Sequence, residues 1–376
     1  MSSKIRSARW LALRVTPSTC WSFVELEDET GRRGAGEATL AGHEAAMARI
    51  FERELEALRG REVAKIDLGP VRSAAGSRAE FAVVSAFDQA LHDLRAQAAG
   101  VSVARALRGR CRESIPVYAN INRGISRRTP DGFAEQAARA VAEGFRAVKI
   151  APFDEIELYG DPHKRPDAQA IDAGLARIAA VRAVVGSDVD LMVDCHWRFN
   201  PAAAETIVQA TEPYGLYWLE CPLPETPEML EALRVLRAQL NRRGVRMAGC
   251  EEMSLVRGFL PFLEAGAYDV IMPDVKYVGG MQEMLAVADT LARYGVGFSP
   301  HNPSGPVCHA ASLQICSTSS DLERLELQYA ETPLFDALVG YSLPAAARGR
   351  VAVPDAPGLG VRLEAELTRR LRVDAS

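Results

Sequence analysis

The sequence lacks the features that would place it in a membrane or in an oxidising compartment. No run approaches the ~18 apolar residues that a membrane-spanning helix needs. The N-terminal run MSSKIRSARWLALRV has only a short apolar stretch, interrupted by Arg14, and lacks a small-residue cleavage site, which argues against a signal peptide. The seven cysteines form an odd set with no Cys-x-x-Cys pair, so we expect reduced thiols in a cytoplasmic protein.

The sequence also lacks any block of like charge. The net charge of −5 comes from 49 acidic and 44 basic residues that are interspersed. A nucleic-acid surface requires clustered Lys and Arg, so we expect no nucleic-acid partner. A small anionic substrate is compatible with this composition, because a local cationic site does not require a basic protein. With 376 residues, of which 48% are hydrophobic, the chain can bury a large core and is expected to form two domains.

Residues 1–114 have the pattern of a small α+β domain. Trp10–Glu27 alternates loosely as one strand, Asp28–Gly31 marks a hairpin turn, and a second strand ends near Glu37. The clearest helix is expected over Ser77–Ala98, with apolar residues at helical spacing and Gly100 as its stop. Strands followed by helices, without alternation, are typical of an α+β arrangement.

Residues 115–330 alternate between short apolar strands and amphipathic helices, which predicts an α/β domain with a parallel sheet. Eight such strands indicate a closed (β/α)₈ barrel rather than an open sheet. Residues 331–376 are too many for one helix, and we expect them to return to the first domain. The eight strands are expected near Pro116–Ala119, Ala147–Ile150, Asp190–Asp194, Tyr217–Glu220, Arg246–Gly249, Val270–Met272, Val296–Ser299 and Arg324–Gln328.

Ionisable residues stand at the ends of seven successive strands. In a (β/α)₈ barrel the active site lies at the C-terminal ends of the strands. Buried charges there cost several kcal/mol each unless they are paired or bound to metal, so such a series is improbable in a purely structural sheet. The residues, from the second strand to the eighth, are Lys149, Asp194, Glu220, Glu251, Asp274, His301 and Glu326.

Three of these, Asp194, Glu220 and Glu251, are carboxylates on adjacent strands that should converge on one point. A hard divalent cation would relieve their repulsion, and an all-oxygen set favours Mg²⁺ over zinc. A single acid at a strand end is usually a helix N-cap, but this alternative is less able to explain three acids at three adjacent strand ends. Glu252 competes with Glu251 as the ligand, because the end of the strand is uncertain by one or two residues.

Three cysteines stand beside these acids, so thiolate ligation of a metal is the alternative to an all-oxygen site. Adjacent side chains on a strand point to opposite faces. We therefore expect Cys195, Cys221 and Cys250 to face the surrounding helices as small buried hydrophobes.

Asp274 and His301 close adjacent strands and can form a hydrogen bond. The carboxylate would orient the imidazole and raise its basicity, which makes His301 a candidate general base. His301 lies in the stiff loop 299–306, which favours a functional role over a structural one, whereas His309 falls in a helical run and is expected to pack.

His196 lies two residues past Asp194, on the same face of an extended chain. It is a candidate second acid/base that could protonate a leaving hydroxyl group. The alternative is a hydrogen bond to the metal ligand alone. The remaining histidines, His43, His92 and His163, have no comparable setting.

Together these motifs resemble the enolase superfamily, in its mandelate racemase-like subgroup, over nearly the whole chain. The resemblance implies a modified (β/α)₈ TIM barrel with an N-terminal α+β capping domain that the C-terminal segment completes. It also implies a symmetric homo-oligomer. The stretches that carry it are SAFDQALHDL at 85–94, GFRAVK at 144–149, VD at 193–194, WLECP at 218–222, GCEE at 249–252, MPD at 272–274 with GG at 279–280, and PHNP at 300–303.

By this resemblance, Asp194, Glu220 and Glu251 would hold Mg²⁺, and His301 paired with Asp274 would be the base. Glu326 would bind the substrate carboxylate. Abstraction of a proton α to a carboxylate creates an enediolate, which needs concentrated positive charge beside its oxygens. Lys149 is expected to supply part of that charge.

One departure from the family pattern narrows the expected activity. The family's racemases carry Lys-x-Lys, whereas this chain has Ala151 at the second position, so one base of a two-base mechanism is absent. Asp194-Cys195-His196 instead looks like the Asp-x-His of acid-sugar dehydratases such as galactonate and mannonate dehydratases. We therefore predict a hydro-lyase that converts an acid sugar to a 2-keto-3-deoxy acid.

Substrate identity is expected to lie in the loops around Thr16–Trp21, Ala41–His43 and Pro152–Arg165. Arg123, at the end of the first barrel strand, is a further candidate contact. For each of these residues a solvated loop position is the alternative.

Three other functions stay open. An epimerase or cycloisomerase would need a second base from the 152–165 loop, for instance Lys164. A catalytically silent sugar-acid binding protein would not require a positioned base, so the Asp274–His301 pair argues against it. The hypothesis of a phosphate-binding barrel is weaker still. Such barrels commonly hold phosphate in the loops after the seventh and eighth strands, whereas Gly279-Gly280 precedes the helix after the sixth strand.

Overall fold

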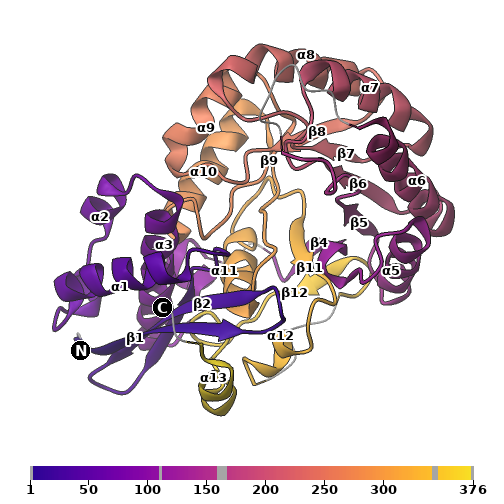
Figure 1. The fold of residues 1–376 in the computed structure, drawn as a ribbon. Coiled ribbons are helices and arrows are strands. Elements are labelled where there is room, and N and C mark those ends of the chain that lie inside the picture. The colour runs from indigo at the N-terminus through magenta and orange to yellow at the C-terminus, as the bar shows by residue number, and fades with distance from the viewer. Residues whose placement is uncertain (1–2, 110–111, 159–166, 341–345, 374–376) are drawn as a thin grey trace.

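The computed structural model describes residues 3–109, 112–158, 167–340 and 346–373. Figure 1 shows two units: a curved sheet surrounded by helices, and a smaller unit of strands and helices that packs against one side of it. The smaller unit contains an antiparallel sheet in the order β1-β2-β3. The larger sheet has the order β10-β9-β8-β7-β6-β5-β4-β11, with β12 beside β4.

The smaller unit, which we call the capping domain, begins with a three-stranded meander. Its helix α3 starts with a capping box between Ser77 and Glu80 and ends at Gly100, whose φ of 69° is left-handed. Its elements are β1 (Ile5–Arg14), β2 (Cys20–Asp28), β3 (Arg33–Glu37), α1 (Glu44–Leu58), α2 (Gly69–Ala74), α3 (Arg78–Ala99) and α4 (Val103–Leu107).

The single strand expected over Trp10–Glu27 is wrong, because the structure has two antiparallel strands there, with Arg14 paired to Cys20. The chain turns at 15–19, where the Thr16 hydroxyl accepts hydrogen bonds from the backbone N–H groups of Ser18 and Thr19. A proline in a strand pattern is a signal of such a break, and Pro17 lies in this turn.

The barrel strands run parallel and alternate with helices. The strands are β4 (Ser114–Asn120), β5 (Ala147–Ile150), β6 (Asp190–Asp194), β7 (Trp218–Glu220), β8 (Arg246–Gly249), β9 (Val270–Ile271), β10 (Gly297–Phe298) and β11 (Leu325–Gln328). The helices are α5 (Pro130–Ala142), α6 (Ala168–Val185), α7 (Pro201–Thr211), α8 (Leu230–Asn241), α9 (Leu255–Glu264), α10 (Met281–Tyr294) and α11 (Pro306–Cys316). Short 3₁₀ turns are η1 (Val63–Lys65), η2 (Asn122–Gly124), η3 (Glu212–Tyr214) and η4 (Pro227–Met229).

The sheet closes through backbone hydrogen bonds between β10 and the segment that leads into β11. Glu323 N–H donates to Phe298 O at 2.8 Å, and Glu326 N–H donates to Pro300 O at 3.3 Å. Inside the barrel, below the strand ends, lies a buried apolar layer. It consists of Tyr118, Ala147, Met192, Trp218, Ala248, Val270 and Met272.

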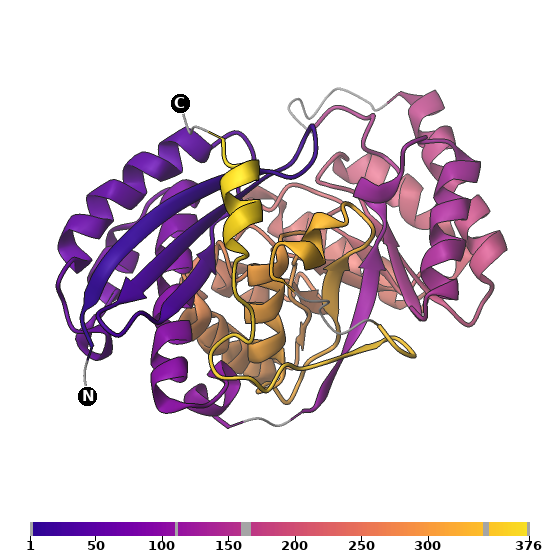
Figure 2. The ribbon, with the colours of Figure 1, turned by 90° about the horizontal axis from the view of Figure 1, so that it is seen from below.

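The C-terminal segment ends against the capping domain. It contains α12 (Leu334–Ala337), β12 (Arg350–Ala352) and α13 (Ala365–Leu371). Figure 2 shows α13 beside the strands of the capping sheet, and there Val373 N–H donates to Ala12 O at 2.9 Å. The expected fold class, a modified barrel with an N-terminal capping domain, is confirmed. Within the described ranges, no helix has the length and apolar character that crossing a membrane would require.

Candidate active site

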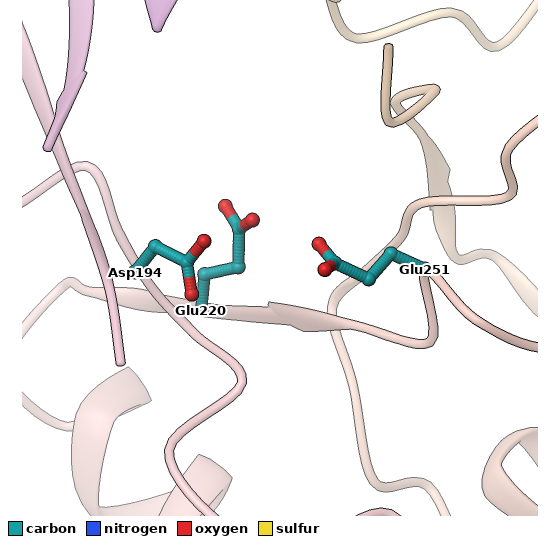
Figure 3. Close-up of side chains that lie close together, drawn as sticks. All are labelled: Asp194, Glu220 and Glu251. Carbon is teal, nitrogen blue, oxygen red and sulfur yellow. The ribbon is translucent and has the colours of Figure 1, made fainter. Parts of the chain in front are cut away.

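Three carboxylates meet at the C-terminal ends of adjacent barrel strands (Figure 3). Asp194 ends β6, Glu220 ends β7, and Glu251 follows β8 by two residues. One oxygen from each lies within 4.8 Å of the others. Their side chains are almost inaccessible to solvent, so the repulsion between them is poorly screened.

The electrostatics of these three side chains, which we call the acidic cluster, fit a bound cation. Burial and Asp194 raise the pKa of Glu251 to about 8, and burial and the neighbouring carboxylates raise that of Glu220 well above its usual range. Glu251 Oε2 is buried and has no hydrogen-bond partner among the described residues. A buried oxygen of this kind is a natural metal ligand, since a hard divalent cation would satisfy it and allow the cluster to ionise.

The structure brings Glu251, rather than Glu252, into this cluster. The Glu252 side chain is partly exposed and forms an ion pair with Arg78, which the capping domain contributes from α3. Cys195, Cys221 and Cys250 are buried with free thiols, and none of them belongs to the cluster.

Lys149, at the end region of β5, lies within reach of three carboxylates. Its Nζ is 2.6 Å from Glu220 Oε1, 3.0 Å from Glu326 Oε1 and 3.8 Å from Asp194 Oδ2. Burial alone would lower the pKa of this amine, but these carboxylates outweigh burial and raise it well above the usual range. Lys149 is therefore held as an ammonium ion on the wall of the pocket.

Glu326 on β11 is fully buried, and both of its oxygens are engaged. Oε1 accepts from Lys149 and from Asn120 Nδ2 at 2.6 Å, while Oε2 accepts from Asn302 N–H at 2.8 Å. The structure thus places Glu326 behind Lys149, which it helps to hold. Its expected contact with a substrate carboxylate stays a prediction.

His301 and Asp274 form the expected pair. His301 Nδ1 lies 2.8 Å from Asp274 Oδ2, and its Nε2 lies 3.6 Å from Glu251 Oε2, so the free nitrogen faces the acidic cluster. Burial would raise the pKa of Asp274, but Lys276 and His301 outweigh it and lower that pKa. Asp274 is therefore ionised and holds the imidazole with Nε2 directed toward the site.

Sequence reasoning missed Lys276, which is buried beside this pair. Its Nζ contacts Asp274 Oδ2 at 2.5 Å and also the Ser304 hydroxyl. Asp274 raises the pKa of this amine against the effect of burial, so Lys276 is also an ammonium ion. No signal in the sequence placed it there, because residues 275–279 form a turn rather than an extended segment, and this turn brings Lys276 back onto Asp274.

His196 lies between two carboxylates. Its Nε2 is 2.8 Å from Asp194 Oδ2, and its Nδ1 is 2.6 Å from Asp154 Oδ1. Burial alone would lower the pKa of the imidazole, but Asp194 and Asp154 outweigh burial and raise it well above its usual range. His196 is thus an imidazolium at the edge of the acidic cluster.

A cavity of about 790 Å³ lies between the barrel mouth and the capping domain, and five of these groups line it: Lys149, Asp194, His196, Lys276 and His301. The capping domain supplies residues 16–20 and 39–41, so two of the loops expected to contact substrate do reach the cavity. Trp21 is instead buried in the core, and His43 is exposed outside the cavity.

Arg123 also lines this cavity, as expected for a substrate contact, and its guanidinium lies 3.2 Å from Glu331 Oε2. In the loop 152–165, Asp154 lines the cavity, whereas Phe153 is buried against Phe199. Residues 159–165 of this loop, which include His163 and Lys164, lie outside the described residues.

Comparisons with known proteins agree with this architecture. Residues 132–367 match the family model described as enolase C-terminal domain-like. Residues 7–107 match the mandelate racemase / muconate lactonizing enzyme N-terminal domain. Among solved structures, a mandelate racemase/muconate lactonizing enzyme from Jannaschia sp. CCS1 superposes with a TM-score of 0.88 at 28% identity, covering 99% of this chain and 98% of that one.

Two curated relatives carry named activities. A D-gluconate dehydratase from Thermoproteus tenax is 34% identical over 294 residues, which are 78% of this chain and 56% of that protein. A D-galactonate dehydratase from Xanthomonas axonopodis pv. citri (strain 306) is 27% identical over 360 residues, which are 93% of this chain and 90% of that protein. With two family models that together span most of its length, the chain belongs to the mandelate racemase/muconate lactonizing enzyme family and is an enzyme of the enolase superfamily.

Proposed function

We propose that this enzyme is a Mg²⁺-dependent hydro-lyase that removes water from an acid sugar and yields a 2-keto-3-deoxy acid. The observation that carries the proposal is the pairing of one oriented base, His301, with one imidazolium, His196, on either side of the acidic cluster. The dehydratase activities of the relatives, on D-gluconate and D-galactonate, support the same reaction class.

Asp194, Glu220 and Glu251 would hold the metal ion. When bound, the ion would supply positive charge beside the carboxylate of the substrate and stabilise the negative charge that develops there. Lys149 adds a fixed ammonium ion next to the same position, because Glu220 and Glu326 keep it protonated and oriented.

The proton on C2 passes to His301. Its Nδ1 is engaged by Asp274, so Nε2 is the nitrogen available to take the proton. The ionised Asp274 then stabilises the imidazolium that forms. The electron pair released from the C2–H bond is delocalised into the carboxylate, which gives an enediolate, and is available to form a C2=C3 double bond.

That pair forms the C2=C3 double bond, while the C3–O bond breaks and its own electron pair departs with the hydroxyl group. His196 already carries a proton on each ring nitrogen, so it can donate one to the departing oxygen, which leaves as water. The product is an enol, and transfer of its hydroxyl proton to C3 by way of solvent gives the 2-keto-3-deoxy acid.

Racemisation would require a second base on the opposite face of C2. The two pocket lysines, Lys149 and Lys276, are both held as ammonium ions by carboxylates, so neither is poised to accept a proton. Among the described cavity residues this leaves His301 as the oriented base. An epimerase would need a base such as Lys164, which lies outside the described residues.

The test is a screen of mono- and diacid sugars with Mg²⁺, in which the 2-keto-3-deoxy product is measured for the wild type and for His301→Asn. We expect product from the wild type and a loss of about 10²-fold or more in rate for the variant. His43→Asn, an exposed histidine outside the cavity, is the matched control and should keep the wild-type rate. Keto acid from none of the sugars, or equal rates for His301→Asn and the wild type, would contradict the proposal.

A further inference from the structure

Glu225 is a carboxylate that the proposed chemistry does not use and that does not line the cavity. It lies in the loop after β7, five residues past Glu220. Its Oε1 accepts hydrogen bonds from Cys250 N–H at 2.5 Å and from the Tyr268 hydroxyl at 2.8 Å. The Trp197 side chain also donates a hydrogen bond to it, and Cys221 Sγ lies 3.9 Å from Oε1.

The partners of Glu225 share an unusual backbone conformation. Trp197, Cys221 and Cys250 have φ values of 56°, 44° and 68°, in the left-handed region that residues with a Cβ rarely adopt. Such a conformation is strained and persists only where surrounding contacts hold it in place. Each also stands close to one member of the acidic cluster, three residues after Asp194 or directly beside Glu220 or Glu251.

Gly249 leaves the space that the Glu225 side chain occupies. A Cβ on Gly249 would lie 2.5 Å from Glu225 Oε1 and 2.7 Å from the Tyr268 ring. The φ of Gly249 is not in the left-handed region, so its lack of a side chain is needed for space rather than for conformation. Glu225, Gly249 and Tyr268 therefore form one packed contact beneath the end of β8.

We propose that Glu225 is a positioning residue for the metal site: it holds the three strand ends that carry Asp194, Glu220 and Glu251 at the spacing a divalent cation requires. It does so through the Trp197 side chain, the Cys221 thiol and the Cys250 N–H, one partner for each strand end. The inference rests on the proposed metal site but not on the identity of the substrate. Partners behind the ligands commonly change metal affinity by about 10–100-fold when they are removed.

The test is isothermal titration calorimetry of the full chain with Mg²⁺ and with Mn²⁺ alone. Glu225→Gln keeps the shape of the side chain but replaces one carboxyl oxygen with an NH₂ group. We expect a Kd for either metal that is about 10–100-fold weaker than that of the wild type. Tyr268→Phe, which removes one donor and leaves the carboxylate, should weaken binding in the same direction by a smaller factor.

Asp269→Asn is the matched control. Asp269 also accepts a backbone N–H on β8, from Met247 at 2.9 Å, but at the opposite end of that strand. This variant should lose thermal stability and keep the wild-type Kd. Equal Kd values for Glu225→Gln and the wild type, or an equal loss in Glu225→Gln and Asp269→Asn, would overturn the inference. A wild type that binds neither metal would instead refute the proposed metal site.

Discussion

At the scale of single residues, His196 shows how the site keeps acid and base apart. Its backbone φ of 45° is left-handed, and its own N–H donates to Asp194 Oδ1 at 2.9 Å. This turn directs the imidazole back toward Asp194 and Asp154, which keep it protonated. His301 has one carboxylate partner at hydrogen-bond distance and leaves its Nε2 free, so the proposed mechanism gives the two histidines of this cavity opposite tasks.

His196→Asn should separate the two halves of the reaction. Asn tolerates the left-handed backbone, so the turn should persist while the proton donor is lost. We expect dehydration to slow by about 10²-fold or more, while exchange of the C2 proton with deuterated solvent continues, because His301 and Asp274 are unchanged. Proton NMR of the substrate in D₂O measures both events. Loss of exchange together with dehydration would show that His196 is not confined to the leaving-group step.

The site residues that the sequence did not predict were missed for a common reason. The residues at strand ends could be predicted because each acid or base follows a short apolar run, as Asp194 and Glu220 do. Lys276 and Glu225 stand in loops past the strand ends, where the path of the chain decides which way a side chain points. Asp154 belongs to the loop 152–165 that was predicted to contact substrate, but its contact with His196 was not predicted, because it too depends on the path of a loop. Such placements depend on tertiary contacts that spacing alone does not encode.

At the scale of elements, the strand bounds predicted from the sequence agree with the structure where a short apolar run ends at a polar residue or a glycine. The bounds expected for β5, β6 and β8 agree with the structure. In the error at 10–27, the strand pattern was continued through a turn, because residues 10–13 of β1 and most of β2 are buried on either side of it. The signal that could have found the turn is the run Thr16-Pro17-Ser18-Thr19, since such clusters are typical of turns.

The helices that follow the Asp274 and His301 loops receive caps from the other domain. α10 and α11 have glycines, Gly280 and Gly305, at their N-caps, and neither offers a side chain. Asp88 accepts Met281 N–H at 2.7 Å. Glu37 accepts Gly305 N–H at 2.7 Å and Cys308 N–H at 2.9 Å. Both carboxylates thus hold barrel loops that carry the base and its partner.

We therefore expect Glu37→Gln to lower kcat by about 10-fold or more on the substrate that the screen identifies, because small displacements of a catalytic group are costly. Its Kd for Mg²⁺ should stay near that of the wild type, since the acidic cluster lies on other strands. Steady-state kinetics with parallel calorimetry measure both quantities.

Asp93→Asn is the matched control for that experiment. Asp93 is a buried carboxylate of α3 that accepts backbone N–H groups from Ala35 and Leu359, away from the barrel strand ends. It should lower the melting temperature without lowering kcat at a temperature where the variant is folded. If Glu37→Gln loses stability but keeps its kcat, the capping carboxylate serves the fold alone.

At the scale of the whole molecule, the barrel concentrates negative charge that the fold leaves partly uncompensated. Two ammonium ions, from Lys149 and Lys276, are each already committed to carboxylates. Glu251 is left with a buried oxygen that has no hydrogen-bond partner among the described residues. In the metal-free protein the acidic cluster therefore keeps a bound proton. The sequence indicated that the three carboxylates would repel one another, but not which of them would carry the proton.

This stored proton predicts how metal-dependent stability varies with pH. Burial raises the pKa of Glu251 from 4.5 to about 8 in the folded, metal-free protein. The folded state thus binds more protons than the unfolded state between these values. The contribution of Glu251 to stability is full below 4.5 and is lost as pH rises through about 8. A bound cation favours the ionised cluster, so its affinity should rise over the same range.

We expect the difference in melting temperature between Mg²⁺-loaded and EDTA-treated protein to be larger at about pH 8.5 than at about pH 6. The reason is that a bound ligand stabilises the folded state more when its affinity is higher. Differential scanning calorimetry at both pH values measures it. Glu251→Gln should abolish most of the difference at each pH, whereas Glu252→Gln, which alters only the ion pair with Arg78, should keep the wild-type behaviour. A difference that is constant or smaller at high pH would mean that the cluster does not release a proton when the metal binds. The charge of the cavity would then have to be balanced by groups other than Glu251.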